Sequence, residues 1–249
     1  MANERLRAAI HEAGFGPEDL AEALGNDRKT VDRWIEGHVP YRRNQHLVAK
    51  LLAVDPGYLW PPVSAEQSRD LGMAELVSLW PVRSHVGNAT WLGLFERAKR
   101  RIDVLVYAGF WLSEDPAIRR LLSAKAESGA RVRFLLGDPH SAAVELRGVE
   151  EGIGSAIAAK IDNTVHNYRG VITAPNTEFR LHATTLYNSV YRSDDEMLVN
   201  THLYGLPGHM TPLMHLRRVP GAELFAAYMD SFERIWELAR PLDAYRQVA

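Results

Sequence analysis

Apolar residues in positions 1–60 recur at the spacing of amphipathic helices. Two apolar stripes lie there, one made by Leu20, Ala21 and Leu24 and the other by Val31, Trp34 and Ile35. Pro17 suits the first turn of the first helix, and Asp27 is a good N-cap for the second. Gly25 lies between the stripes, where the backbone at a helix end can adopt a left-handed angle. The pattern predicts two short helices that cross at the small Ala21 and are joined by a tight turn.

The rest of the chain alternates between helix patterns and buried-strand patterns. The expected helices cover 89–101, 115–128, 142–168 and 221–239, and the expected strands cover 102–107, 131–136 and 178–183. Residues 189–192 and 196–200 are expected to pair as a hairpin about 193–195. Because strand and helix patterns alternate, we predict an α/β sandwich after an all-α N-terminal part.

A boundary between these two parts is indicated by Pro61, Pro62 and the polar stretch 64–69. We therefore expect a helical domain at residues 1–62, a linker or docking segment at 63–85, and the α/β domain at 86–249.

Composition limits the class of protein. The chain has 249 residues, 46% hydrophobic residues, a net charge of −2 and no cysteine. This allows two modest folded domains and excludes disulfides and thiolate zinc sites. No apolar run approaches the ~18 residues of a membrane span, and the N-terminus does not resemble a signal peptide. His202, His209 and His215 do not stand at a helical spacing from a carboxylate, so no compact set of zinc ligands is visible in the sequence. We expect a cytoplasmic protein with no metal, no cofactor and no membrane partner.

The second predicted helix keeps a polar outer face once its apolar stripe is buried. That face comprises Arg28, Lys29, Thr30, Asp32 and Arg33. Arginine can pair with guanine in the major groove, and lysine or threonine can contact phosphate or base. Four later residues are expected to contact phosphate at the start of the next helix: Tyr41, Arg42, Arg43 and Asn44. The pattern predicts a DNA-reading helix-turn-helix. The alternative is a small helical bundle with a solvated charged face.

Residues 3–60 resemble the phage-repressor-like (Xre family) domain of five helices. The first helix of this domain would carry the apolar residues Leu6, Ala9 and Ile10. The fourth helix would carry Leu47, Val48, Leu51 and Leu52, and residues 54–60 resemble the last short helix. The family often has glutamine at the start of the first motif helix, where this chain has Pro17. Phosphate anchoring must then come from elsewhere. The resemblance implies binding to a double-stranded DNA operator.

The charge of this part argues for a dimer. Residues 1–60 contain 8 Lys+Arg and 9 Asp+Glu, so a DNA-binding surface there is a local patch. Because affinity for DNA scales with the phosphates neutralised, one copy should bind weakly. We expect a homodimer on a two-part operator with half-sites roughly one turn apart.

The C-terminal part has a distinctive order of segments: a helix, IDVLVYAG, a helix, ESGARVRFLLGDP, a helix, and a strand that ends in a histidine. This order resembles one half of a phospholipase D-like domain. The superfamily motif HxK(x)4D has its counterpart in HATTLYNS: His182 matches, but Thr184 stands at the lysine position and Ser189 at the aspartate position. Without the lysine, negative charge that develops on phosphate loses a main stabiliser. We therefore expect a domain without phospholipase activity and no enzyme.

Polar side chains are dense for the interior of a sheet in this region. Those expected to line a ligand pocket are Arg180, His182, Thr184, Tyr187, Asn188, Tyr191, Asn200 and His202, with Arg192 and Tyr204 nearby in sequence. Such groups are costly to bury unless they bond to something, and a phosphate-bearing effector is one solution. The alternative is that they bond to one another or lie on the surface.

These features favour a dimeric, DNA-binding transcription regulator. Its C-terminal domain would dimerise and sense a small effector, and ligand binding would bias the spacing of two reading heads. Two other functions stay open. One is a DNA-targeted nuclease or phosphodiesterase that uses His182 from each chain. The other is a protein-interaction module, for which exposed Tyr107 or Trp111 would be evidence.

Overall fold

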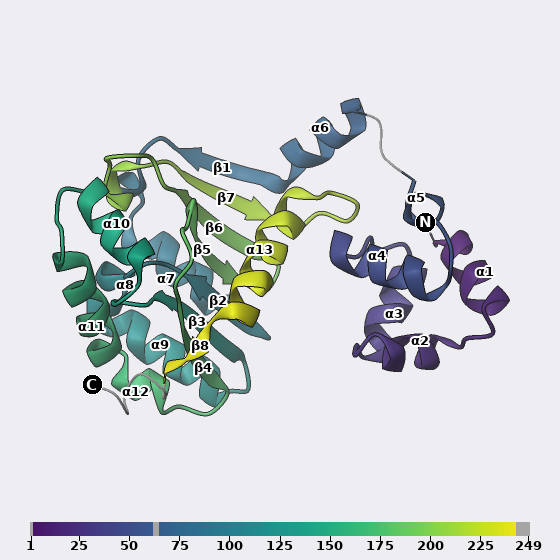
Figure 1. The fold of residues 1–249 in the computed structure, drawn as a ribbon, viewed down its shortest axis with the longest axis horizontal. Coiled ribbons are helices and arrows are strands. Elements are labelled where there is room, and N and C mark those ends of the chain that lie inside the picture. The colour runs from purple at the N-terminus through teal and green to yellow at the C-terminus, as the bar shows by residue number, and fades with distance from the viewer. Residues whose placement is uncertain (1, 62–64, 243–249) are drawn as a thin grey trace. The chain divides into compact units, whose positions relative to one another are not determined.

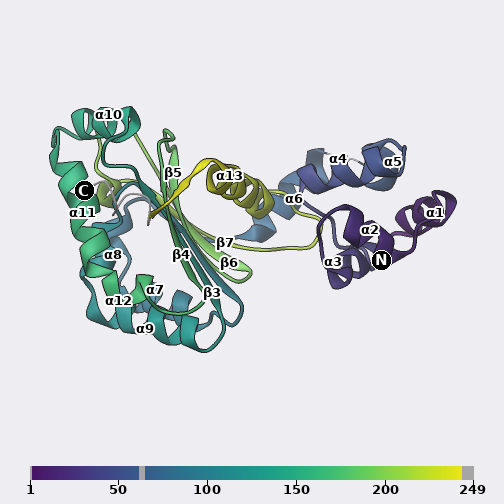
Figure 2. The ribbon, with the colours of Figure 1, turned by 60° about the horizontal axis from the view of Figure 1, so that its bottom comes forward.

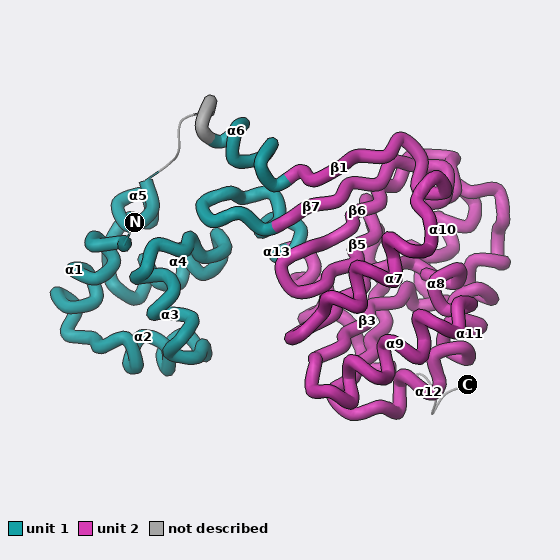
Figure 3. The backbone as a smooth tube through the Cα atoms, turned by 180° about the vertical axis from the view of Figure 1, so that it is seen from behind, with its two compact units in different colours: residues 1–75, 218–230 teal, residues 76–217, 231–249 magenta. Residues whose placement is uncertain are grey.

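The computed structural model describes residues 2–61 and 65–242 (Figure 1 and Figure 2). Contacts between Cα atoms divide the chain into two compact units (Figure 3). Unit 1 comprises residues 1–75 and 218–230, and unit 2 comprises residues 76–217 and 231–249. Pro62 and Ser64, which belong to the expected boundary, lie outside the described residues.

Unit 1 begins with a group of short helices. They are α1 (Glu4–Glu12), α2 (Pro17–Ala23), α3 (Arg28–Ile35), α4 (Arg42–Leu51) and α5 (Pro56–Leu59), followed by α6 (Ala65–Glu75). Asn3 caps α1 by accepting from the amide of Leu6, and Asp27 caps α3 by accepting from the amide of Thr30 at 2.7 Å. Gly25 has φ of +64°, which permits the tight turn between α2 and α3.

The core of these helices is built from the residues that the apolar stripes predict. Leu6, Leu20, Val31 and Val48 are each 0% exposed, and Trp34 is 5% exposed. Each helix is too short to be stable alone, so this shared burial is what holds α1 to α5 together.

Unit 2 contains an eight-stranded sheet of order β1-β7-β6-β5-β2-β3-β4-β8. The strands are β1 (Leu76–Trp80), β2 (Arg101–Leu105), β3 (Arg131–Gly137), β4 (Thr177–His182), β5 (Asn188–Ser193), β6 (Glu196–Thr201), β7 (Leu213–Arg217) and β8 (Arg240–Pro241). β2, β3 and β4 run parallel, and β5 continues the sheet antiparallel to β2. β2 and β3 are buried on both faces because helices cover both sides of the sheet.

Figure 2 shows helices α7 to α12 on one face of this sheet and α13 on the other. The helical segments are η1 (Arg83–His85), α7 (Asn88–Glu96), α8 (Phe110–Glu114), α9 (Pro116–Glu127), α10 (Ala142–Glu150), α11 (Ala156–Asn167), α12 (Arg169–Ile172), η2 (Gly208–Met210) and α13 (Leu224–Leu238). At the start of α13, the amides of Leu224 and Phe225 donate to the buried carboxylate of Glu75.

A buried charge network lies on the α13 face of the sheet. Asp103 of β2 is 0% exposed and accepts from Arg133 of β3 at 2.6 Å and from Arg192 of β5 at 2.9 Å. Arg133 also donates two hydrogen bonds to Glu233 of α13, at 2.9 Å and 2.7 Å. Burial acts to lower the pKa of Arg133, but its bonds to Glu233 and Asp103 outweigh burial and raise that pKa.

The mixed helix–sheet fold expected from the sequence is confirmed. The segment expected as a linker or docking segment at 63–85 contains α6, strand β1 and η1 in its described residues, and β1 pairs with β7. The helical stretch expected at 142–168 breaks between α10 and α11, where Gly152 and Gly154 both have positive φ. No helix in the described part of the chain is long and apolar enough to cross a membrane.

Candidate functional sites

The outer face of α3 is the candidate DNA-contacting surface. Val31, Trp34 and Ile35 are buried in unit 1, which turns the opposite side of the helix outward. Arg28, Lys29 and Arg33 are exposed there, and Thr30 and Asp32 are half-buried. The five residues expected on this face therefore lie together on one helix surface, with three cations exposed.

Arg28 forms ion pairs with neighbours on this surface. It pairs with Glu18 of α2 and, through Nε, with Asp32 at 3.3 Å. The side chains of Arg28 and Glu18 are more than half exposed and that of Asp32 is 39% exposed, and solvent-accessible pairs of this kind contribute about 0–1 kcal/mol. A nucleic-acid phosphate or base edge can therefore displace them at small cost.

The second group of expected DNA contacts lies at the start of α4. Tyr41 immediately precedes the helix, and Arg42, Arg43 and Asn44 form its first turn. Arg42 and Arg43 are exposed, and Arg42 pairs with Glu223 at 3.0 Å. The first turn has no side-chain cap, so its amide groups point toward the place where a phosphate oxygen would bind.

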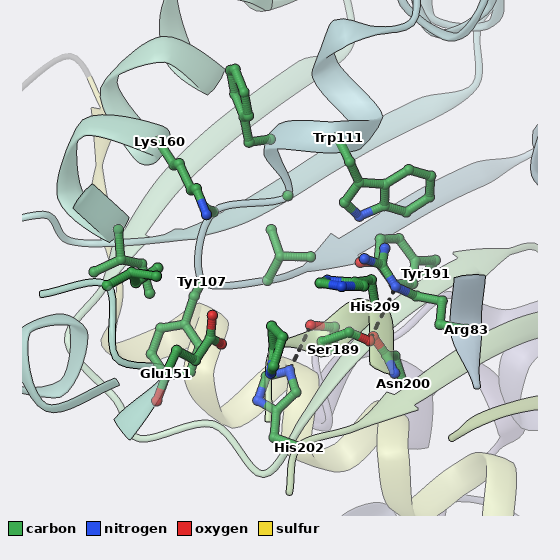
Figure 4. A pocket seen from close by; sticks show the side chains of 18 residues that line it. Arg83, Tyr107, Trp111, Glu151, Lys160, Ser189, Tyr191, Asn200, His202 and His209 are labelled. Atoms are coloured by element: carbon green, nitrogen blue, oxygen red, sulfur yellow. Dashed lines mark hydrogen bonds between the residues drawn. The ribbon is translucent and has the colours of Figure 1, made fainter. Parts of the chain in front are cut away.

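The candidate ligand site is a cavity of about 380 Å³ in unit 2 (Figure 4). It lies where β2 ends and α8 begins, and side chains from α11, β5, β6 and η2 complete it. The residues that line it are Arg83, Val106, Tyr107, Ala108, Gly109, Phe110, Trp111, Glu151, Ile153, Ile157, Lys160, Ser189, Tyr191, Asn200, Pro207, Gly208, His202 and His209. Its size is in the range of small-molecule sites.

The structure divides the residues expected to form the ligand pocket. Tyr191, Asn200 and His202 line the cavity. Arg180 does not, because it donates to Glu178 at 2.8 Å and to the backbone oxygen of Trp236.

The remaining expected pocket residues also lie off the cavity. Tyr187 is 79% exposed, Thr184 and Asn188 are half-buried, and His182 is 2% exposed. The Arg–His–Thr set proposed for phosphate is therefore not assembled at this cavity.

His182 is closed off by the backbone around it. Its Nε2 lies 3.1 Å from the carbonyl oxygen of Val106, and its Nδ1 accepts from the amide of Thr184 at 3.3 Å. This pattern assigns the proton to Nε2 and occupies the lone pair of Nδ1. Burial lowers the pKa of His182, which keeps the ring neutral.

His202 makes a different pair of contacts inside the cavity. Its Nε2 lies 3.0 Å from the hydroxyl of Ser189, and its Nδ1 lies 3.2 Å from the carbonyl oxygen of Leu186. The carbonyl assigns the proton to Nδ1, so the Ser189 hydroxyl donates to Nε2. Burial, with repulsion from Arg147 and Arg83, lowers the pKa of His202 to about 4.

Several cavity residues were not expected from the sequence. Arg83 lies in the segment expected as linker, and Trp111 and Lys160 lie on helices far apart in sequence. No short motif joins them, so only the arrangement of α8, α11 and η1 reveals the cavity. Tyr107 is 7% exposed and Trp111 is half-buried at the cavity, so neither is an exposed aromatic of the kind expected for a protein-binding surface.

The described residues contain no group of three or more His, Asp or Glu side chains placed to hold a metal ion. The polar groups of the cavity are instead two cations, two histidines, hydroxyls, an amide and one carboxylate. Such a set can bind a small organic molecule by hydrogen bonds and charge.

Comparison with known proteins gives likenesses in solved structures alone. No protein-family model and no curated protein matches the chain. TrmBL2, described as an archaeal chromatin protein with a novel mode of DNA binding, is similar with a TM-score of 0.40 and 14% identity, over 80% of this chain and 62% of that one. The chain thus spans less than two thirds of TrmBL2.

Two further solved structures are also similar. One is Nuc, a phospholipase D family member from Salmonella typhimurium, with a TM-score of 0.39 and 15% identity, and the other is NucT from Helicobacter pylori, with 0.43 and 11%. Each match covers 66% of this chain and 97% of the other. Because all three TM-scores lie below 0.5, the function of this chain is argued from its own geometry.

Proposed function

We propose that the chain is a dimeric DNA-binding regulator of the Xre type, in which α3 reads the major groove and the cavity of unit 2 binds a small effector. The observation that carries the proposal is the outer face of α3. The helix exposes Arg28 and Lys29 at its start and Arg33 in its last turn, while its other side is fixed in the core. Cations at the start of the second helix of such a pair are the groups that reach base edges and phosphates.

Self-association follows from the small size of this cationic surface. Unit 1 offers three exposed cations on α3 and two in the first turn of α4, and Arg28 and Arg42 are paired with carboxylates. Each neutralised phosphate contributes only part of the affinity for DNA. Two copies on two half-sites are therefore expected to bind much more tightly than one copy on one half-site.

A non-catalytic role for unit 2 is supported by the geometry of His182. A nucleophilic histidine needs a free nitrogen lone pair facing its substrate. Here Nδ1 accepts from the amide of Thr184, Nε2 faces the carbonyl of Val106, and the side chain lies off the cavity.

The alternative of a DNA-targeted phosphodiesterase has a direct test. Hydrolysis of a chromogenic phosphodiester is measured for the wild type and for His182→Ala. Equal background rates support the non-catalytic assignment. A wild-type rate well above background that falls to background in His182→Ala establishes the phosphodiesterase instead.

Regulation requires the effector to bind the two DNA-binding states with different affinity. The proposed mechanism is that occupation of the unit 2 cavity changes which arrangement of two copies is favoured, and so the spacing of the two α3 helices. A ligand with equal affinity for both arrangements would change nothing.

Binding to DNA is tested with a fluorescently labelled random-sequence duplex and the full chain. The triple variant Arg28→Ala, Lys29→Ala, Arg33→Ala removes the exposed cations of α3 and is expected to lose most binding at moderate salt. The matched control Lys99→Ala, Arg120→Ala, Arg234→Ala removes the same charge from exposed positions of unit 2. Equal affinity of the two triple variants would contradict the assignment of α3.

A further inference from the structure

The unit 2 cavity contains a guanidinium that forms no direct ion pair with a carboxylate of the described residues. Arg83 donates from Nε to the backbone oxygen of Gly208 at 3.2 Å, and its Cζ lies 4.4 Å over the ring of Trp111. Within the described residues it forms no ion pair with Asp or Glu. Burial lowers the pKa of Arg83, against the opposing effect of Tyr191 and Glu151, so its positive charge is held in a partly desolvated place.

Other ionisable groups lie near the cavity, but none within the described residues is a direct carboxylate partner of Arg83. Glu151 and Glu150 both pair with Arg147, at 2.7 Å and 3.3 Å, and that guanidinium is 5% exposed. Glu151 acts on Arg83 through the electric field alone, which opposes the lowering of the Arg83 pKa. His202 is neutral near pH 7 because its pKa is lowered to about 4. Lys160 and His209 are exposed at the edge of the cavity, where water solvates them. Within the described residues, Arg83 is therefore the cation of the inner cavity wall that has no carboxylate within ion-pair distance.

The rest of the lining is largely aromatic and aliphatic. Phe110 and Trp111 line the cavity from α8, Tyr107 lines it from the segment between β2 and α8, and Ile153 and Ile157 line it before and within α11. Figure 4 shows Tyr107 and Trp111 at the cavity. Trp111 is held in place by edge contacts with Trp91 at 4.7 Å and Tyr191 at 6.1 Å between ring centroids. A flat apolar group would replace water against these fixed rings.

Charge balance decides which ligand fits. An uncharged molecule would displace water from the guanidinium of Arg83 without giving it a directly bonded anion, which is costly. A phosphate monoester near neutral pH brings more negative charge than one guanidinium neutralises. A carboxylate brings one negative charge and matches the planar fork of the guanidinium.

We propose that the cavity binds an aromatic monocarboxylic acid, with the carboxylate on Arg83 and the ring against Trp111 and the aliphatic wall. This assignment rests on the proposed role of the cavity as the effector site and names the chemical class of the effector. It replaces the phosphate-bearing ligand expected from the sequence, because Arg180 and Thr184 lie off the cavity.

The test is calorimetric titration of the full chain without DNA near neutral pH. The probes are benzoate, 1-naphthoate, benzamide and phenyl phosphate. We expect benzoate and 1-naphthoate to bind. Benzamide lacks the charged hydrogen bond and phenyl phosphate carries an excess negative charge, so the affinity of each is expected to be lower by about tenfold or more. This comparison uses the wild-type protein, so it does not depend on how any variant folds.

Two variants locate the site. Arg83→Met keeps the length of the side chain and removes its charge, and it is expected to weaken benzoate by about tenfold or more. Arg120→Met makes the same change at an exposed position outside the cavity and is expected to bind benzoate as the wild type does. Circular dichroism establishes that both variants are folded.

The outcomes separate this inference from the proposed function. Binding of phenyl phosphate more tightly than benzoate would overturn the carboxylate assignment and leave the cavity as an effector site. Failure of all four probes to bind, or benzoate binding unchanged in folded Arg83→Met, would overturn the inference. DNA binding by the same protein is measured independently on the duplex, and the effect of the α3 triple variant there tests the proposed function.

Discussion

Replacing Asp103 by asparagine is expected to destabilise unit 2 by about 3–5 kcal/mol, the cost of breaking a buried ion pair from one side. Asp103 is fully buried and accepts charged hydrogen bonds from Arg133 at 2.6 Å and Arg192 at 2.9 Å. Asparagine has nearly the same shape, so packing is preserved. The change removes one negative charge and leaves the two guanidiniums short of a counter-ion.

The magnitude is consistent with counting the bonds. Each hydrogen bond to a charged group contributes about 1.5–3 kcal/mol, and Asp103 accepts two. Arg133 retains its two hydrogen bonds to Glu233, so the loss of unfolding free energy should lie toward the lower end of the expected range. Because a domain is stable by about 5–15 kcal/mol, the variant should still fold with much reduced stability.

Urea unfolding followed by hydrogen exchange of peptides from β2 and β3 reports unit 2 alone. Asp195→Asn is the control, because Asp195 pairs with Arg100 at an exposed position and should cost about 1 kcal/mol or less. The double variant Asp103→Leu, Arg192→Met removes both charges and is expected to lose less stability than Asp103→Asn. A loss below about 1 kcal/mol for Asp103→Asn would refute the assignment of this network as a buried, charge-balanced unit.

Three further predictions concern the candidate sites. Arg28→Ala should relax base choice at one operator position at a cost of ~1–3 kcal/mol, measured by competition among operator variants, and intact discrimination would contradict the role given to Arg28. Arg42→Ala should weaken binding to all sequences alike and reduce the slope of log affinity against log salt by about 0.9, measured by anisotropy at several salt concentrations; an unchanged slope would remove Arg42 from the phosphate contacts. His202 has a pKa of about 4 in the folded chain against an ordinary 6.5, so as pH falls it is protonated in the unfolded chain before it is protonated in the folded chain. Stability should fall by about 3 kcal/mol between pH 6.5 and 4 on this account. His202→Gln should flatten that fall in urea unfolding, whereas the exposed His85→Gln should retain it.

Local periodicity was sufficient to predict much of the fold. The stripe of Val31, Trp34 and Ile35 predicts α3 because a short helix is held by the one face it buries. β2 and β3 are predicted because strands covered on both faces read as apolar runs.

Strands β1 and β7 were not predicted, for a physical reason. β1 is an edge strand of five residues with Val77 and Leu79 about half exposed, so it has no clear buried face. β7 has the mixed sequence LMHLR and is defined by its pairing with β1 and β6. Pairing between segments far apart in sequence leaves no local pattern.

The same limit applies to the ligand site. The eight-residue stretch that begins at His182 suggests one site, but His182 ends β4 and Ser189 lies on β5. β2 and β3 lie between those strands in the sheet, which at about 4.8 Å a strand separates the two side chains widely. The cavity residues Arg83, Trp111 and Lys160 come together only when η1, α8 and α11 are placed on the sheet.

The measurement that tests the central claim most directly is a selection of bound sequences from a random duplex library. It is performed with the full chain and with the Arg28→Ala, Lys29→Ala, Arg33→Ala variant. We predict that the wild type enriches a palindromic motif with half-sites about one helical turn apart and that the variant loses it. Enrichment of no motif by the wild type, or of the same motif by the variant, would contradict the assignment of α3 as the DNA-reading helix.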